Sequence, residues 1–411
     1  MDMNVEGITV VSPMYGDRKI TDRMVFSVLH QYISTKNPFN IHLVLVDDYL
    51  EKRGANDESY YQYYLSDDFK QFYDTNRIKI SLIKNTEHKY QGESREIGFM
   101  AGDYPFFLLV DCDDMLAPNC CDRYLMAIND NQTEGKMISC IQGLLYSFDT
   151  DGYDNCINGD SIWVQSRCFN RDFIVKHGIH FPVGINSKCG EDYPFIQKLD
   201  YAINHDKESV CIQFDFNNPD GKCQCSAYWF PNEKSLSRID PHYSQHLSGW
   251  TMQSSNSILD FFEEYNRKHG YVDEEDEFMK HEYLNMNIYA FYNILDFLKE
   301  VAATDYVPDI PDWYALRDNV KRLRKRLKEK YWDEIVYSDV EDMLYNVKHF
   351  SDCHFTESWI GTFRDYMETE HEILSFDYRE MIDYCKNLEF DAAGHEIHAP
   401  YVVAWAKRHH M

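Results

Sequence analysis

Glycine and proline are scarce in this chain, with 18 and 12 among 411 residues, and no glycine-rich phosphate-binding motif occurs. There is no G-x-G-x-x-G after the first apolar segment and no G-x-x-x-x-G-K-[ST] anywhere. These absences argue against a dinucleotide-binding fold and against a P-loop nucleotide hydrolase. A phosphate group bound by this chain would therefore need cations in place of a glycine cradle.

The chain also has no stretch of 18 or more apolar residues, so the sequence predicts no membrane-spanning helix. Its first residues lack the basic and then apolar pattern of a signal peptide. Twelve cysteines without such a signal are most simply reduced thiols, and we expect a cytoplasmic protein. The net charge of -28 disfavours nonspecific binding to nucleic acid or anionic membrane by the whole surface. A Cys-x-Cys at 223–225, with Cys211 and His205 upstream, fits no common zinc pattern.

What the chain does have is enough apolar material, 44% of its residues, for two domains with sizeable cores. The amino-terminal part alternates short apolar runs with segments of helical periodicity. This alternation predicts an α/β fold, a mostly parallel sheet flanked by helices with right-handed crossovers. The expected strands are residues 8–11, 41–46, 78–83 and 106–109, and the expected helices are residues 22–32 and 93–101.

Polar residues collect where three of these strands end. Residues 12–18 follow the first strand, Asp47 and Asp48 follow the second, and residues 111–114 follow the fourth. Because the carboxyl ends of parallel strands share one edge of a sheet, these clusters should converge on a binding crevice.

The fourth cluster, Asp-Cys-Asp-Asp at 111–114, places three carboxylates directly after a buried apolar run. Carboxylates this close repel one another unless they hold a hard divalent cation, which itself bridges phosphate oxygens. An Asp-x-Asp by itself also suits an ordinary loop start, so the interpretation depends on the surrounding sequence.

Five segments in order resemble the family 2 glycosyltransferases, nucleotide-sugar enzymes of the Rossmann-like GT-A fold. They are ITVVSPMYG, LVLVDD, ESREIGFMAGDYPFFLLVDCDD, GEDYPF and YWFPNEKSLSR, and the resemblance covers residues 5–240. It implies a GT-A domain over residues 1–245 and an enzyme that transfers a sugar from a UDP-sugar to an acceptor hydroxyl.

The resemblance implies a donor-binding role for five residues of the first three segments, Pro13, Tyr15, Asp47, Asp48 and Arg95. Tyr15 would lie against the uracil ring, and Asp47 would accept from its N3–H. Arg95 would lie near the diphosphate, where a guanidinium can bond two oxygens at once. The alternatives are a rim tyrosine, turn aspartates and a surface ion pair.

The same resemblance makes Asp113 the ligand of Mn²⁺ or Mg²⁺, with Asp111 assisting the metal or holding the ribose, and leaves Asp114 structural. Asp192, with Glu191 beside it, corresponds to the catalytic base of an inverting single displacement. Without the resemblance, either carboxylate would be an ordinary helix-start residue, favoured there by the helix dipole.

One departure from the family pattern is Glu96, which stands where an Asn commonly follows the arginine, at an expected helix start. It raises the possibility of a changed sugar preference. Two other functions stay open: a nucleotidyltransferase, which also uses metal-binding aspartates beside a parallel sheet, and a nucleotide-sugar-binding module without turnover.

After residue 245 the pattern becomes helical, and residues 246–411 are expected to form a mostly helical second domain that contributes to acceptor binding or oligomerisation. Two apolar stripes predict helices: Leu284, Ile288, Phe291, Leu295 and Leu298, then Leu316, Val320, Leu323, Leu327 and Tyr331. Pro308 and Pro311 separate them, and further helical segments are expected between residues 343 and 384.

The second of these helices is unusually basic for so acidic a chain, with six Lys or Arg residues between Arg317 and Lys330. The face pairs either with acidic neighbours such as residues 273–277 or with an anionic acceptor. Such an acceptor would be a nucleic acid, as for phage-type transferases that modify DNA bases, or a membrane-linked phosphorylated glycan.

Overall fold

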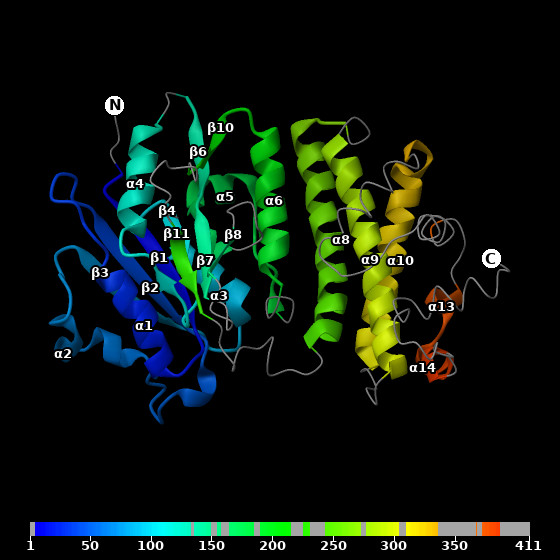
Figure 1. Cartoon of the computed structure of the whole chain (residues 1–411), viewed down its shortest axis with the longest axis horizontal. Helices are drawn as coiled ribbons and strands as arrows, with labels where there is room; N and C mark the ends of the chain where they lie inside the picture. Colours follow the sequence, from blue (N-terminus) through cyan, green and yellow to red (C-terminus); the bar gives the residue numbers. More distant parts are fainter. Residues whose placement is uncertain are drawn as a thin grey trace. The chain divides into compact units, whose positions relative to one another are not determined.

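The protein is seen here in a computed structural model, which describes residues 5–132, 135–148, 154–157, 164–184, 190–214, 225–230, 243–272, 277–303, 310–335, 367 and 372–386. The chain divides into two compact units, residues 1–239 and 240–411, coloured from blue to green and from green to red in Figure 1. None of the described helices is long and apolar enough to cross a membrane.

The first unit is built on a seven-stranded sheet with the order β10-β6-β9-β4-β1-β2-β3. Six strands run in one direction, and only β9 is antiparallel to its neighbours. The predicted mostly parallel α/β architecture is therefore confirmed. The strands are β1 (Gly7–Met14), β2 (Asn40–Asp47), β3 (Ile78–Lys84), β4 (Phe106–Leu109), β6 (Met137–Gln142), β9 (Arg167–Asn170) and β10 (Ser209–Gln213).

The central strands are buried on both faces, as expected for parallel strands covered by helices. Every residue of β1 and β4 is buried, and so is every residue of β2 after Asn40. These runs carry β-branched and aromatic side chains, which suit a pleated sheet interior. The four strands predicted from the sequence lie within β1, β2, β3 and β4.

The helices of this unit are α1 (Arg18–Leu29), α2 (Asp67–Lys70), α3 (Tyr90–Met100), α4 (Cys120–Asp130), α5 (Arg171–His177) and α6 (Asp192–His205). Helix α1 begins four residues before the predicted start because the Asp17 side chain caps it, accepting from the Lys19 N–H. It ends before Tyr32, which is 59% exposed and not part of the apolar face.

Helix α3 packs directly on β1 and β2. A Cβ atom added at Gly98 would lie 2.2 Å from Val11 Cγ1 and 3.1 Å from Val46 Cγ2, so only glycine allows this approach. Phe99 on the same helix stacks on Phe107 of β4, with ring centroids 4.5 Å apart. These contacts fix the position of α3 against the sheet.

A second sheet, in the order β5-β11-β7-β8, lies in the same unit. Its strands are β5 (Met115–Leu116), β7 (Leu144–Phe148), β8 (Asp154–Ile157) and β11 (Cys225–Trp229). The described residues of this unit also form short 3₁₀ turns: η1 (Leu50–Lys52), η2 (Gln62–Leu65) and η3 (Val164–Ser166), the last directly before β9.

In the second unit the described elements are helical, as predicted: α8 (Tyr243–His269), α9 (Glu277–Ala303), α10 (Ile310–Lys330), η6 (Trp332–Glu334), α13 (Glu372–Ser375) and α14 (Tyr378–Lys386). Helices α8, α9 and α10 pack on one another. The predicted stripe Leu316, Val320, Leu323, Leu327 and Tyr331 is buried along α10, and Leu284 and Ile288 are buried on α9. Pro311 lies in the first turn of α10, where its missing N–H costs no helical bond.

Several expectations lie outside the described residues. They concern residues 185–189 of the stretch before Glu191, Cys223, residues 231–238 of the last resembling segment, residues 273–276, Pro308, most of residues 343–384, and the side chains of Phe291, Leu295 and Leu298.

Candidate functional site

Three neighbouring parallel strands, β4, β1 and β2, end at one edge of the main sheet. The register pairs Val11 with Leu109 and Met14 with Asp47. Beyond the strands, the Val110 N–H donates to the carbonyl of Val11 at 3.0 Å. The segments carrying Tyr15, Asp48 and Asp111 therefore start from the same edge, as the sequence predicted.

Arg95 on α3 is the centre of the polar cluster at this edge, and it is only 1% exposed. Its Nη2 donates to Asp111 Oδ1 at 2.6 Å. Its Nη1 donates to Asp192 Oδ1 at 2.5 Å and also to Glu191. One guanidinium thus brings together three carboxylates that the sequence placed in the site, and the surface ion pair considered for Arg95 is excluded.

The charge balance of this cluster is negative, with three carboxylates around one guanidinium. Burial raises the pKa of Asp192 well above its ordinary value, although the Arg95 charge opposes the shift. The neighbouring charges of Glu191 and Asp111 add to the increase. A carboxylate with a raised pKa is a stronger base, which suits proton abstraction near neutral pH.

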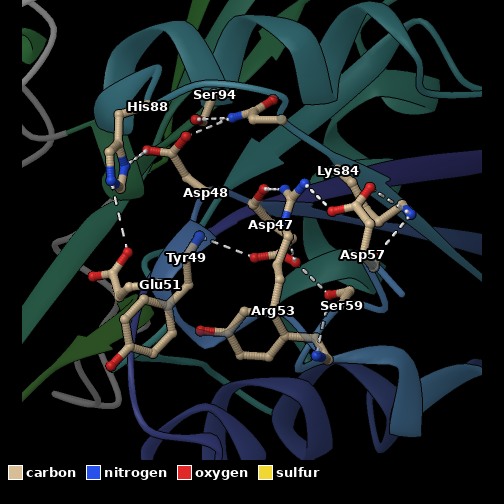
Figure 2. Close-up of polar contacts among 12 residues, drawn as sticks. Asp47, Asp48, Tyr49, Glu51, Arg53, Asp57, Ser59, Lys84, His88 and Ser94 are labelled. Carbon is tan, nitrogen blue, oxygen red and sulfur yellow. Dashed lines mark hydrogen bonds and ion pairs between the residues drawn. The ribbon is translucent and has the colours of Figure 1, made fainter. Parts of the chain in front are cut away.

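The two aspartates at the end of β2 are buried, and Figure 2 shows their polar contacts. Asp48 accepts from the backbone N–H groups of Lys89 at 2.9 Å and Tyr90 at 3.0 Å, and from Asn85 Nδ2 at 2.8 Å. It is 4% exposed and ties the end of β2 to the start of α3. The structure therefore gives Asp48 a role in positioning the helix that carries Arg95.

Asp47 is fully buried, and both of its carboxylate oxygens are engaged. Oδ1 accepts from the Tyr49 N–H at 2.9 Å, while Oδ2 accepts from Ser59 Oγ and lies 3.7 Å from Arg53 Nε. Figure 2 shows these contacts within the loop after β2. Contact with a uracil base would require Asp47 to exchange one of these bonds, and that role stays a prediction.

Most of this arrangement lies in a segment that matches a known protein family. Residues 9–187 match the family described as Glycosyl transferase family 2. This match assigns residues 9–187 to a family 2 glycosyltransferase domain. The matched segment contains the three aspartate-bearing strand ends and Arg95 of the transferase, and it stops just before Glu191 and Asp192.

Solved structures of similar proteins include TarS 1-349 from S. aureus in complex with UDP-GlcNAc. It is 12% identical to the transferase, with a TM-score of 0.45, covering 79% of this chain and 93% of TarS 1-349. The mannosyltransferase PcManGT from Pyrobaculum calidifontis, in complex with GDP-Man and Mn²⁺, is 11% identical with a TM-score of 0.41, covering 84% of this chain and 88% of that one. No curated protein sequence matches the transferase.

The residues that follow β4 in the transferase fit a divalent cation that is held partly by the protein and partly by the phosphates of a substrate. Among the described residues, no three His, Cys, Asp or Glu side chains form a ready metal cage. Mg²⁺-type cations on nucleotide substrates need only one or two carboxylates, because phosphate oxygens and water complete the shell. Asp113 is half-buried, and each Asp111 oxygen keeps an acceptor position beyond its bond to Arg95 or Gln165, so this pair fits that mode.

Asp114 differs from its neighbours, because it is 1% exposed and its Oδ1 accepts from the Phe230 N–H at 3.0 Å. It joins the turn after β4 to the end of β11. Burial raises the pKa of Asp114 well above its ordinary value, and the charges of Asp111 and Asp113 add to that shift. The contact agrees with the structural role expected from the sequence.

Tyr15 presents an aromatic face at the same edge and is 53% exposed. Its ring lies 4.9 Å from that of Tyr49 and 6.0 Å from that of His88, and its hydroxyl donates to Glu51 at 2.7 Å. An exposed aromatic group of this kind can stack on a planar base. Pro13, by contrast, is buried within β1 and paired in register with Val46, so its side chain belongs to the sheet.

Glu96 lies in the middle of α3, so its description as a helix-start residue was wrong; the helix already begins at Tyr90. Its carboxylate accepts from the Phe181 N–H at 3.0 Å and lies 2.6 Å from His180 Nδ1. Glu96 therefore holds the segment after α5, and neighbouring Arg95 holds Glu191 and Asp192. Helix α3 anchors the chain on both sides of residues 185–189.

The turn η3, which the sequence did not predict as part of the site, also contacts the carboxylate cluster. Gln165 Nε2 donates to Asp111 Oδ2 at 2.6 Å, and the Val164 N–H hydrogen-bonds to the Asp192 carboxyl group. No motif marks these residues. The available signal was a polar Gln-Ser-Arg inserted in an otherwise apolar run, Ile-Trp-Val before it and Cys-Phe after it.

Proposed function

We propose that this glycosyltransferase moves a sugar from a UDP-sugar to an acceptor hydroxyl, with inversion of the anomeric configuration. The observation that supports the proposal is the gathering of Asp111, Glu191 and Asp192 around Arg95 at the carboxyl edge of the parallel sheet. Ligands of open α/β sheets bind at that edge.

Asp192 is the proposed base. It takes the proton from the acceptor hydroxyl as that oxygen attacks the anomeric carbon, and the nucleoside diphosphate leaves from the opposite face. One base and one displacement give inversion, and no carboxylate nucleophile of the kind found in retaining glycosidases is required. Its raised pKa, caused first by burial, favours this proton transfer.

Arg95 keeps Asp192 and Asp111 in place, because both of its terminal nitrogens are committed to carboxylates. Direct contact of Arg95 with the diphosphate remains a prediction from the family resemblance. A bound Mn²⁺ or Mg²⁺, held by Asp113 with Asp111, would neutralise charge on the departing diphosphate. Tyr15 would lie against the base of the donor.

The proposal is tested by titrating UDP-glucose, UDP-GlcNAc and GDP-mannose into the wild type, Asp113→Ala and Asp192→Asn, with and without Mn²⁺. Binding of a UDP-sugar should depend on Mn²⁺ and be lost in Asp113→Ala. Asp192→Asn should bind the donor almost normally, while transfer falls about 10²–10⁴-fold, the usual contribution of a general base.

Asp67→Asn is the matched control, because the Asp67 side chain is 96% exposed and pairs only with Lys70. It should behave like the wild type in both measurements. If the protein binds no uridine nucleotide, a UDP-sugar is rejected as the donor. Binding with no transfer to any acceptor, water included, would support the nucleotide-sugar-binding module, and full turnover by Asp192→Asn would remove Asp192 from its role.

The acceptor depends on the helical unit, where the basic face of α10 is largely paired. Arg322 and Arg326 contact Asp260 of α8 at 2.6 and 2.9 Å, and Lys330 contacts Glu263 at 3.0 Å. These acidic partners lie on α8, and the predicted pairing with residues 273–277 falls outside what the structure describes.

The exposed lysines of α10, Lys321, Lys325 and Lys328, are what this face offers to an anionic acceptor such as a nucleic acid or a phosphorylated membrane-linked glycan. Affinity for duplex DNA or for anionic vesicles should then fall steeply with salt and decrease in Lys321→Ser. An affinity that does not change with salt concentration would refute an anionic acceptor.

A further inference from the structure

The 3₁₀ turn η3 contacts two of the three carboxylates that Arg95 also holds. All three of its residues are buried, at 0% for Val164, 3% for Gln165 and 0% for Ser166. The Val164 N–H bonds to the Asp192 carboxyl group, and Gln165 Nε2 bonds to Asp111. Two consecutive residues of one turn therefore contact two different carboxylates of the site.

The turn itself is rigidly placed by its third residue. The carbonyl of Ser166 accepts from the Gly143 N–H at 2.7 Å and from the Tyr124 hydroxyl at 2.9 Å. A Cβ atom at Gly143 would lie 2.1 Å from Ser226 Oγ and 2.2 Å from that hydroxyl, so the backbone approach is close. A side chain on this turn is consequently held at a fixed distance from the cluster.

The orientation of the Gln165 amide follows from its partner. With Nε2 toward Asp111 Oδ2 at 2.6 Å, a donor faces a carboxylate; the flipped amide would bring two acceptors together. The other end, Oε1, is buried and has no hydrogen-bond partner among the residues that the structure describes. An unpartnered buried acceptor destabilises a fold by an amount comparable to what one charged hydrogen bond contributes. The Gln165 amide therefore adds little to the stability of the fold. Stability does not explain why an amide stands at this position.

Asp111 is held at both oxygens, with Oδ1 bonded to Arg95 and Oδ2 bonded to Gln165. With either bond alone, the carboxylate could rotate about its Cβ–Cγ bond. With both bonds present, its plane is fixed, and so are the directions of its remaining acceptor positions. A fixed carboxylate is what a ribose hydroxyl or a diphosphate-bound cation requires.

We propose that Gln165 is a positioning residue of the transferase, which orients Asp111 for the nucleoside-diphosphate part of the donor. The inference rests on the proposed function and extends it to a residue that lies within the matched residues 9–187 but in none of the five sequence segments named above. Its role acts through Asp111, without contact of its own with the sugar.

The test compares the wild type with Gln165→Met, which keeps the length of the side chain and removes both polar atoms. Donor affinity is measured by calorimetry with UDP-glucose and UDP-GlcNAc in Mn²⁺, turnover by release of UDP with water as acceptor, and stability by the urea midpoint. Affinity or turnover should fall about 10–100-fold, as for other residues that orient a ligand-binding carboxylate. The urea midpoint should stay close to that of the wild type.

Gln142→Met is the matched control, since Gln142 is also buried, at 8%, but its Oε1 accepts from the neutral amide of Gln213. It should leave donor affinity unchanged. If Gln165→Met does not fold, Gln165→Asn, one methylene too short to reach Asp111, replaces it and should show the same loss.

The outcomes separate the two proposals. A wild type that binds neither UDP-sugar overturns the proposed function. A wild type that binds, together with a Gln165→Met variant of equal affinity and turnover, overturns the role of Gln165 alone. A lowered urea midpoint with unchanged affinity per folded molecule assigns Gln165 to the fold and overturns the inference as well.

Discussion

Removal of the guanidinium in Arg95→Met tests whether the cluster at the sheet edge is an ion-paired unit. The variant keeps much of the side-chain volume but leaves Asp111, Glu191 and Asp192 without their shared cation. The Arg95 side chain is 2% exposed and that of Glu191 is 5% exposed, so water replaces little of the lost interaction. The variant therefore leaves uncompensated charge inside the protein.

The magnitude follows from that burial. Breaking a buried ion pair by removing one partner costs about 3–5 kcal/mol, because the remaining charge stays desolvated. For a folding unit of this size, 1 kcal/mol shifts the melting temperature by about 2–4 °C. The melting temperature of the first unit should therefore fall by about 6–20 °C in Arg95→Met.

The pH dependence has a definite sign. The pKa of Asp192 is already raised by burial, and Arg95 opposes that rise, so the variant should raise it further. When the pKa of a carboxyl group is higher in the folded state than in the unfolded state, the folded protein becomes less stable as pH rises between the two pKa values. The deficit of Arg95→Met should thus be largest near pH 8 and shrink toward pH 5.

Thermal unfolding at pH 5, 6, 7 and 8 measures this deficit, with Lys70→Ala as control. Lys70 forms an exposed ion pair with Asp67, at 49% and 96% exposure, and its loss should cost less than about 1 kcal/mol. A deficit for Arg95→Met as small as that of the control, or one that does not change with pH, would refute the ion-paired cluster.

Three further changes test other parts of the site. Gly98→Ala should lower the free energy of unfolding, measured with urea, by about 1–3 kcal/mol, because its Cβ would meet Val11 at 2.2 Å; an equally stable variant would mean that α3 shifts freely. Tyr90 has φ = 56°, so Tyr90→Gly should be about 1–2 kcal/mol more stable than Tyr90→Ala in urea unfolding, since only glycine avoids the left-handed strain; equal stabilities would exclude strain there. Asp192→Asn should have a higher urea midpoint than the wild type at pH 8 and an equal one near pH 4, because the raised pKa makes the buried carboxylate costly at high pH; a lower midpoint at pH 8 would contradict it.

Much of the sheet could be predicted because its strands are continuous apolar runs that end in polar clusters. Residues 41–46 and 106–109 needed no long-range information to be assigned as buried strands. The position of Arg95 under the carboxylates could not be predicted, since its ion pair with Asp192 joins positions 97 residues apart. The resemblance located both residues in the site but not their contact.

Gln165 and Val164 could not be predicted as site residues, because their position depends on the strand order of the sheet. Strand β9 is inserted antiparallel between β4 and β6, and this insertion brings the preceding turn to the end of β4. Sequence periodicity carries no information on strand order. The same limit applies to α10, where the buried stripe was predicted correctly but the acidic partners of its basic face, Asp260 and Glu263, were not.

Helix α3 with Arg95 is complete early in the chain, whereas Glu191 and Asp192 follow almost one hundred residues later. During synthesis on the ribosome, α3 and Asp111 would therefore emerge well before Glu191 and Asp192, the other two carboxylates paired with Arg95. Contacts between such distant positions form slowly, because closure of a long loop has to precede them. The cluster around Arg95 should consequently close only after residue 192 has emerged, and a nascent chain arrested before that residue should remain open to protease around α3.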